Sequence, residues 1–353
     1  MTATIQKHRD SNLELFRVLV MLSIIAHHYV VNSGVWNEIQ AVEPTTNSLF
    51  YYIFGMWGKT GINCFVLITG WFMCTSQITF RKFLKLLLEI EFYKIVIGVI
   101  FLLTGKETFS SEWLLDLLPV RNIKTGFVAA FLFFFLLIPF LNILVKNMTR
   151  KQHLLLIALL FFLYTVLSTI PVFSVSMNYV SWFCVLYVYS SFMRLHGFPL
   201  KDNNLAWLVL SLTCILISVV SVIAIRFYPK SINPYWFVSD SNKLMALMTS
   251  CSFNFFRTLR LPVSHFINAL GATTFGVLLI HANSNAMRQW LWTDLFDNVG
   301  HLAIPHYAFR ACAIVLLVFF VCAGIDYLRV MFLERPLFAF YDKRAVKINE
   351  EIQ

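Results

Sequence analysis

Charged residues are scarce in this sequence. Only 13% of its 353 residues are Asp, Glu, Lys or Arg, whereas a soluble globular domain carries about 25%. Hydrophobic residues make up 59% of the chain, and its mean hydropathy is +0.72. A water-soluble fold of this size needs far more polar surface, so that class is excluded. The composition predicts a polytopic helical membrane protein.

Cysteine motifs and processing signals are also missing. The seven cysteines lie within apolar runs and show no Cys-x-x-Cys spacing, which favours small core residues over disulfides or metal ligands. No small-residue cleavage site follows the run after Arg17, so that run is expected to be a span and not a signal peptide. No long polar segment interrupts the chain. We therefore expect one membrane domain over residues 1–353, with a bundle at 9–340 and short cytoplasmic tails.

Apolar runs recur along the whole chain, and each is long enough to cross a hydrocarbon core about 30 Å thick. They predict an all-α fold with about ten transmembrane helices. The predicted spans are residues 13–33, 48–76, 84–104, 126–145, 154–173, 180–194, 204–226, 241–257, 264–284 and 307–331.

The basic residues give the expected orientation. Most Lys and Arg fall in connections on the same side as the N-terminus, including Arg81, Lys82, Lys85, Arg150 and Lys151. Cytoplasmic loops carry such an excess, so both termini are predicted to be cytoplasmic. The formal charge of +10 is then a topology signal, and the expected partner is membrane lipid and not nucleic acid.

The first span contains two ionisable residues that share one face. On a helix, the step from Arg17 to His28 turns about 20° beyond three full turns and rises about 16 Å. His27 points about 100° away and is expected to face another helix or the interface. Ionisable groups within spans are costly and tend to be functional. Arg17 near the cytoplasm and His28 deep in the span would suit a long anionic ligand. Alternatively, Arg17 reaches lipid phosphates and His28 bonds to a neighbouring helix.

The stretch "FRVLVMLSIIAHHY" resembles the first span of the acyltransferase-3 family of integral membrane acyltransferases, whose signature is an Arg, ten residues and a His. Arg17 and His28 match this signature. The second span, "GKTGINCFVLITGWFMC", is similar to the family's Gly-Val-Asp/Asn-x-Phe-Phe-x-x-Ser-Gly-Phe segment. Thr69 stands where Ser is usual, and Asn63 fits the Asp/Asn position. Glycines in spans also allow close packing, and Asn63 suits either a site or a helix contact.

The basic cluster before the third span also resembles the family, which has an Arg-x-x-Arg there. Here Lys82 and Lys85 have that spacing, with Arg81 adjacent. An ammonium then replaces a bidentate guanidinium, and an ordinary positive-inside loop would look the same. Within this span, Glu91 and Lys94 are spaced to pair on one helix face.

Three later segments extend the resemblance. In "TGFVAAFLFFFLLIPFLNIL", Pro139 and Asn142 match the family pattern, while Gly126 replaces its Trp. "FGVLLIH" retains the family's histidine as His281, at a depth similar to that of His28. "FLERPLFAF" resembles its closing Glu-x-Pro segment. His281 alone would suit helix packing, but with His28 it indicates a site at which two histidines converge.

The resemblance implies acyl transfer, by default of acetyl, from cytoplasmic acyl-CoA to a hydroxyl of a cell-surface glycan or its lipid-linked precursor. Lipopolysaccharide, capsule, exopolysaccharide and teichoic acid all fit this description of the acceptor. It also implies a multi-pass protein of a bacterial cytoplasmic membrane, with acetyl-CoA as co-substrate and no metal. The basic inner face (Arg17, Arg81, Lys82 and Lys85) would attract the CoA phosphates.

His28 would be the general base, and His281 or Asn63 would bind the developing oxyanion. Direct transfer is expected because no Ser or Cys nucleophile stands beside a base. The alternative function is a transporter or flippase for a lipid-linked sugar, with the intramembrane ionisable residues forming its path. The sequence shows no inverted repeat that would favour transport. A non-catalytic scaffold would leave the placement of His and Arg unexplained.

Overall fold

The structure, a computed structural model, describes residues 10–121, 126–170, 172–173, 175, 178–197, 203–228, 232–238 and 243–352. The first nine residues of the predicted N-terminal tail and the start of the predicted span 241–257 lie outside this part. Every regular element within the described ranges is helical, and none is a strand. The all-α class predicted from the sequence is confirmed.

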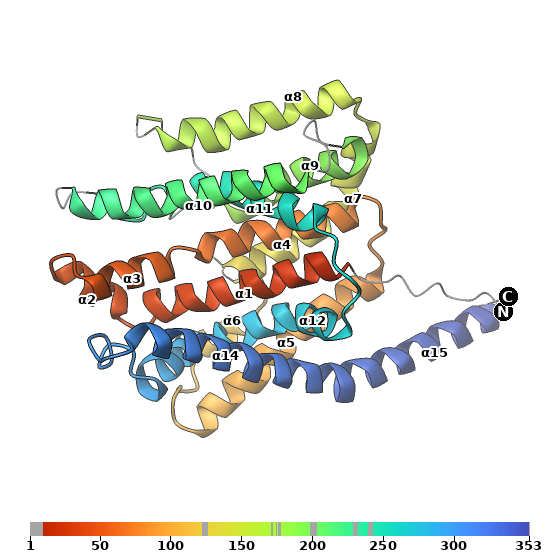
Figure 1. Cartoon of the computed structure of the whole chain (residues 1–353). Helices are drawn as coiled ribbons and strands as arrows, with labels where there is room; N and C mark the ends of the chain where they lie inside the picture. Colours follow the sequence, from red (N-terminus) through yellow and green to blue (C-terminus); the bar gives the residue numbers. More distant parts are fainter. Residues whose placement is uncertain are drawn as a thin grey trace.

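Most of the chain lies in long helices that cross the molecule roughly side by side (Figure 1). The α-helices are α1 (Ser11–Val31), α2 (Val35–Ala41), α3 (Thr46–Gly55), α4 (Gly58–Met73), α5 (Phe80–Leu103), α6 (Ser111–Asp116), α7 (Phe127–Asn147), α8 (Arg150–Phe161), α9 (Tyr179–His196), α10 (Asn204–Phe227), α11 (Leu244–Thr258), α12 (His265–His281), α13 (Asn285–Gln289), α14 (Tyr307–Arg329) and α15 (Arg335–Ile352). Three π-helical segments continue α8, α13 and α14: η1 (Phe162–Leu167), η2 (Trp290–Leu295) and η3 (Val330–Glu334).

Several of these helices are suited to a membrane. Five are long and apolar enough to cross one, and there are six if α12 and the segment from α13 through η2, bent by 95°, count as one broken span. The protein is therefore a multi-pass membrane protein. Helices α4, α11 and α12 have 16, 15 and 17 residues, fewer than the roughly 20 of a typical span. The predicted total of ten spans and the orientation of the termini stay predictions.

The predicted span 48–76 consists of two helices. Thr45 caps α3 by accepting a hydrogen bond from the Ser48 amide, and α3 ends at Gly55 before α4 begins at Gly58. A Cβ on Gly55 would lie 2.8 Å from Val30, and one on Gly61 would lie 2.2 Å from Ile24. These glycines let both helices approach α1 closely, which is the packing that glycines in spans were expected to allow.

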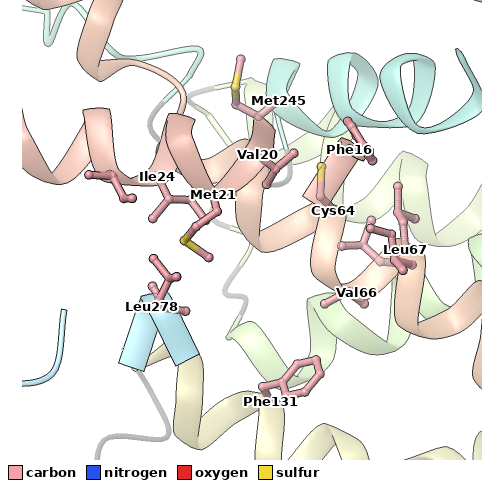
Figure 2. Packing of buried hydrophobic residues seen from close by; sticks show 14 of the residues in the cluster. Phe16, Val20, Met21, Ile24, Cys64, Val66, Leu67, Phe131, Met245 and Leu278 are labelled. Carbon is pink, nitrogen blue, oxygen red and sulfur yellow. The ribbon is translucent and has the colours of Figure 1, made fainter. Parts of the chain in front are cut away.

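Helix α1 lies inside the bundle, where it contacts α3, α4, α11, α12 and α14. Most of its apolar side chains, among them Met21 and Ile24, are buried. Figure 2 shows Met21 and Ile24 on the side of Leu278 of α12, with Cys64 of α4 further along the same buried cluster. This packing fixes the angular position of α1, and with it the direction in which its histidines point.

The chain path gives the bundle two distinct ends. Helices α1, α5 and α12 finish at one end, where α4, α7, α9 and α14 begin (Figure 1). We call this the histidine end, because His28 and His281 lie in the last turns of α1 and α12. At the opposite end, α15 projects beyond the bundle (Figure 1).

Candidate active site

A cavity of about 330 Å³ lies at the histidine end. It is bounded by the last turns of α1 and α12, the first turns of α4, α7 and α9, and the middle of α5. The polar and charged residues that line it are His27, His28, Lys59, Lys94, Tyr179, Asn283 and Arg288. Apolar side chains, including Phe65 and Phe127, form much of the remaining wall. Such a mixed lining is typical of a small-molecule site.

The structure brings the two predicted histidines into direct contact. The Nδ1 atom of His28 lies 3.0 Å from the Nε2 atom of His281. His28 lines the cavity, whereas His281 is fully buried behind it. The pairing arises because α1 and α12 pack side by side and end at the same level.

The hydrogen bonds assign the protons of this pair. The Nδ1 atom of His281 lies 2.6 Å from the carbonyl oxygen of Val277, and because a carbonyl only accepts, His281 Nδ1 carries the hydrogen. The Nε2 atom of neutral His281 is then an acceptor, so His28 Nδ1 donates to it. His28 is left with an unprotonated Nε2, and no hydrogen bond from this atom to a described residue occurs. The arrangement presents a free imidazole lone pair at the cavity.

His27 also contributes to the cavity. Its Nδ1 atom donates to the carbonyl oxygen of Gly55 at 2.6 Å, and its ring packs so tightly on α4 that a Cβ on Gly58 would lie 2.3 Å from it. The expected contact with another helix therefore exists. The same ring lines the cavity, which the helical projection of α1 alone did not indicate.

Three cavity residues were not singled out from the sequence as site residues. The ammonium of Lys59 donates to the Tyr179 hydroxyl at 2.7 Å, and Arg288 reaches the cavity from α13. Lys59 and Arg288 therefore line the same cavity as His28. An ionisable residue at the start of the "GKTG" segment was the available signal for Lys59, but the approach of Tyr179 and Arg288 depends on tertiary packing.

Asn63 lies in the core of the helix bundle. It is fully buried, and its Oδ1 atom accepts a hydrogen bond from Trp182 Nε1 at 2.8 Å, which joins α4 to α9. Asn142 links helices in a similar way, because its Oδ1 accepts from Tyr187 and its Nδ2 donates to the Met73 carbonyl. Neither asparagine is among the cavity-lining residues.

The four predicted CoA-binding cations lie toward the opposite end of the bundle, away from the cavity. Arg17 forms an ion pair with Glu14 at 3.3 Å on α1. Arg81 binds Asp342 of α15 through two hydrogen bonds, and Lys85 lies 2.6 Å from Glu334. Lys82 donates to Ser76 and to the Gln77 carbonyl. Apart from Asn63, the predicted site residues thus form two groups, one at each end of the bundle.

A comparison with known families decides the identity of this bundle. The family model Acyl_transf_3, described as an acyltransferase domain, matches residues 10–327. The chain belongs to this acyltransferase family. No significant match was found among curated proteins or among solved structures.

Membership of Acyl_transf_3 makes the protein a membrane acyltransferase. The matched region includes Arg17, the three basic residues of α5 and both histidines. The transporter alternative gains no support, because the matched family is one of acyltransferases. Among the described residues, no group of three or more His, Cys, Asp or Glu is arranged to hold a metal ion.

Proposed function

We propose that this acyltransferase moves an acetyl group from cytoplasmic acetyl-CoA to a hydroxyl of a cell-surface glycan or its lipid-linked precursor. The observation that carries the proposal is the His28–His281 contact, which leaves His28 Nε2 unprotonated at the cavity. A positioned imidazole of this kind suits general-base catalysis on a hydroxyl.

In the proposed reaction, His28 Nε2 takes the proton of the acceptor hydroxyl while the hydroxyl oxygen attacks the thioester carbonyl. The C–O bond of the new ester forms, and the C–S bond of the thioester breaks. The proton on His28 then passes to the departing thiolate, which leaves as CoA–SH. Transfer is direct, with no acyl-enzyme, and the histidine returns to its starting state.

His281 is proposed as a positioning residue and not as a second base. Its one acceptor atom holds His28 Nδ1–H, and its one donor is held by Val277. This chain fixes the ring orientation and the tautomer of His28. It also stabilises the imidazolium that forms when His28 takes a proton, as a hydrogen-bond partner of a catalytic histidine does.

The donor is proposed to enter from the opposite end of the bundle. Arg17, Arg81, Lys82 and Lys85 form a basic group there that suits the CoA phosphates. Because each of them already contacts an acid or an oxygen atom of the protein, binding must exchange some of these contacts. The thioester arm would then run along α1, over the roughly 16 Å that separate Arg17 from His28.

For Asn63 we propose a structural role, since its bond to Trp182 holds α4, which carries Lys59, against α9. The membrane is proposed to be the bacterial cytoplasmic membrane, with the histidine end facing outward. The acceptor would then reach His28 from the side on which cell-surface glycans lie.

The test uses the purified full-length protein in lipid vesicles. Labelled acetyl-CoA and a panel of bacterial surface glycans are added, and acetyl ester formation is followed. We expect an alkali-labile acetyl ester to form on a glycan hydroxyl. We also expect acetyl-CoA to raise the melting temperature of the protein. Stabilisation by a glycan lipid with none by acetyl-CoA, together with no transfer, would contradict it.

A further inference from the structure

The charged lining of the cavity has only one sign. Lys59, Lys94 and Arg288 line it, and no Asp or Glu is among the described residues of its lining. All three are half-buried. Because a cation that is partly removed from water without a counter-charge is costly, such a group calls for a ligand that supplies the missing charge.

Two of the cavity cations, Lys59 and Arg288, have only neutral partners among the described residues. Lys59 donates to the Tyr179 hydroxyl, and Arg288 donates to the Ala282 carbonyl at 3.3 Å and to Asn285 at 3.5 Å. The Nε atom of Arg288 is buried with no hydrogen-bond partner in the described structure. Neither side chain forms an ion pair with a described carboxylate.

The positive charge of Lys94, the third cavity cation, is partly compensated by its surroundings. It donates to the carbonyl oxygens of Asp116 and Leu118, each at 3.0 Å. The negative charges of Glu91 and Asp116 act on it, although the close Glu91–Lys94 pair anticipated from their spacing is replaced by these carbonyl contacts. Lys59 and Arg288 therefore define the uncompensated pair.

Cations at the opposite end of the bundle are arranged differently. Arg81 and Lys85 pair with Asp342 and Glu334, and Arg329 contacts Glu89, Asp326 and Glu334 at 3.1, 2.9 and 2.9 Å. Each of these three cations is neutralised by carboxylates of the chain itself. Lys82 at that end and Arg310 have only neutral partners among the described residues, but neither lines the cavity.

We propose that the acyl acceptor carries a carboxylate or phosphate next to the hydroxyl that is acylated, and that Lys59 and Arg288 bind this anion beside His28. This assignment rests on the proposed function, because it specifies the chemical class of the acceptor in the proposed acyl transfer. Phe65, Phe127 and Tyr179 line the same cavity and offer apolar ring surface for the carbon–hydrogen face of a sugar. An acidic or phosphorylated sugar satisfies both features.

The anion belongs to the acceptor and not to the donor, since the two cation groups lie at different ends of α1. When the CoA phosphates are held near Arg17, their charge is about 16 Å from His28 along the helix. The uncharged thioester end is what reaches the cavity. Lys59 and Arg288, which line the cavity together with His28, are then left for the second substrate.

The experiment compares three probe acceptors with the reconstituted full chain: a galacturonate oligosaccharide, its carboxyl-reduced galactose counterpart, and a phosphorylated galactose oligosaccharide. Thermal stabilisation by each probe without acetyl-CoA measures binding, and acetyl transfer measures turnover. Lys59→Met and Arg288→Gln are compared with the control Lys106→Met. Lys106 lies at the histidine end too, but it pairs with Asp294 and does not line the cavity.

We expect kcat/KM for an acidic probe to exceed that for the neutral probe by about ten- to hundredfold. This ratio corresponds to the free energy of a typical hydrogen bond to a charged group. Lys59→Met and Arg288→Gln should remove that preference and the stabilisation, and Lys106→Met should keep both. The carboxylate and phosphate arms identify which anion the site takes.

Equal use of all three probes, in a reaction that still needs His28, would overturn the acidic-acceptor assignment and leave the proposed function intact. A rise in KM for acetyl-CoA in Lys59→Met or Arg288→Gln would overturn it too, by placing the donor at these cations. Absence of transfer to every probe, with no stabilisation by acetyl-CoA, would contradict the proposed function itself.

Discussion

At the scale of single residues, His28 and His281 differ in role although both are histidines on neighbouring helices. His28 faces the cavity with an unprotonated Nε2, whereas His281 accepts from His28 through Nε2 and donates to the Val277 carbonyl through Nδ1. The difference comes from one backbone carbonyl, that of Val277, which fixes the proton on His281 Nδ1.

The positioning role of His281 predicts a graded response to substitution. Replacement His281→Leu removes the acceptor for His28 Nδ1–H and should lower kcat by about 100-fold, with little change in the KM for acetyl-CoA. His281→Gln keeps a side-chain oxygen acceptor and should retain more activity than the leucine variant. Steady-state kinetics of both variants test this. Equal activity of His281→Leu and wild type would show that the contact has no catalytic role.

Sequence reasoning predicted the convergence of His28 and His281, because both matched one family pattern at similar depth. It did not predict Lys59, Tyr179 and Arg288. These side chains come from three different helices, α4, α9 and α13, and only the packed bundle brings them to one cavity. The cationic lining is a tertiary property that no local spacing encodes.

At the scale of helices, close approach depends on glycine. A Cβ on Gly58 would lie 2.3 Å from the His27 ring, whereas one on Gly324 of α14 would meet nothing within 4 Å. We expect Gly58→Ala to destabilise the protein by about 1–3 kcal/mol through overpacking. Gly324→Ala should be neutral or stabilising by up to about 1 kcal/mol, from helix propensity. Thermal unfolding in detergent measures both, and equal effects would contradict the packing described for α4.

Arg329 joins α5 to α14 through its three carboxylate partners, and it is 7% exposed at its side chain. Arg329→Met would leave those carboxylates buried without their cation, so we expect a loss of about 3–5 kcal/mol. Arg81→Met breaks a pair whose side chains are 44% and 52% exposed and should change stability little. A melting temperature for Arg329→Met equal to that of Arg81→Met would argue against a structural role for the network.

The sequence located most helices but not their interruptions. The apolar run 48–76 contains no proline, so hydropathy alone gave it one span. The observed break between α3 and α4 follows the packing of Gly55 and Gly58 on α1. In the same way, α12 and the α13–η2 segment form a bend of 95° that an apolar pattern does not reveal.

At the scale of the whole molecule, the two ends of the bundle are proposed to serve different substrates. Orientation in the membrane is therefore a prediction of the account. In a Cys312→Ser background, which removes the exposed native cysteine, Lys106→Cys should react with an impermeant maleimide in intact cells. Arg150→Cys should react only after permeabilisation. The reverse labelling would contradict an outward-facing histidine end.

The central claim is that the imidazole of His28, and not that of its neighbour His27, is the base. Both rings line the cavity and both donate through Nδ1. The direct measurement is single-turnover acetyl transfer from labelled acetyl-CoA by wild type, His28→Ala and His27→Ala in the same vesicles. We predict a loss of about 10²–10⁴-fold for His28→Ala and a much smaller loss for His27→Ala. Wild-type transfer by His28→Ala would contradict the account.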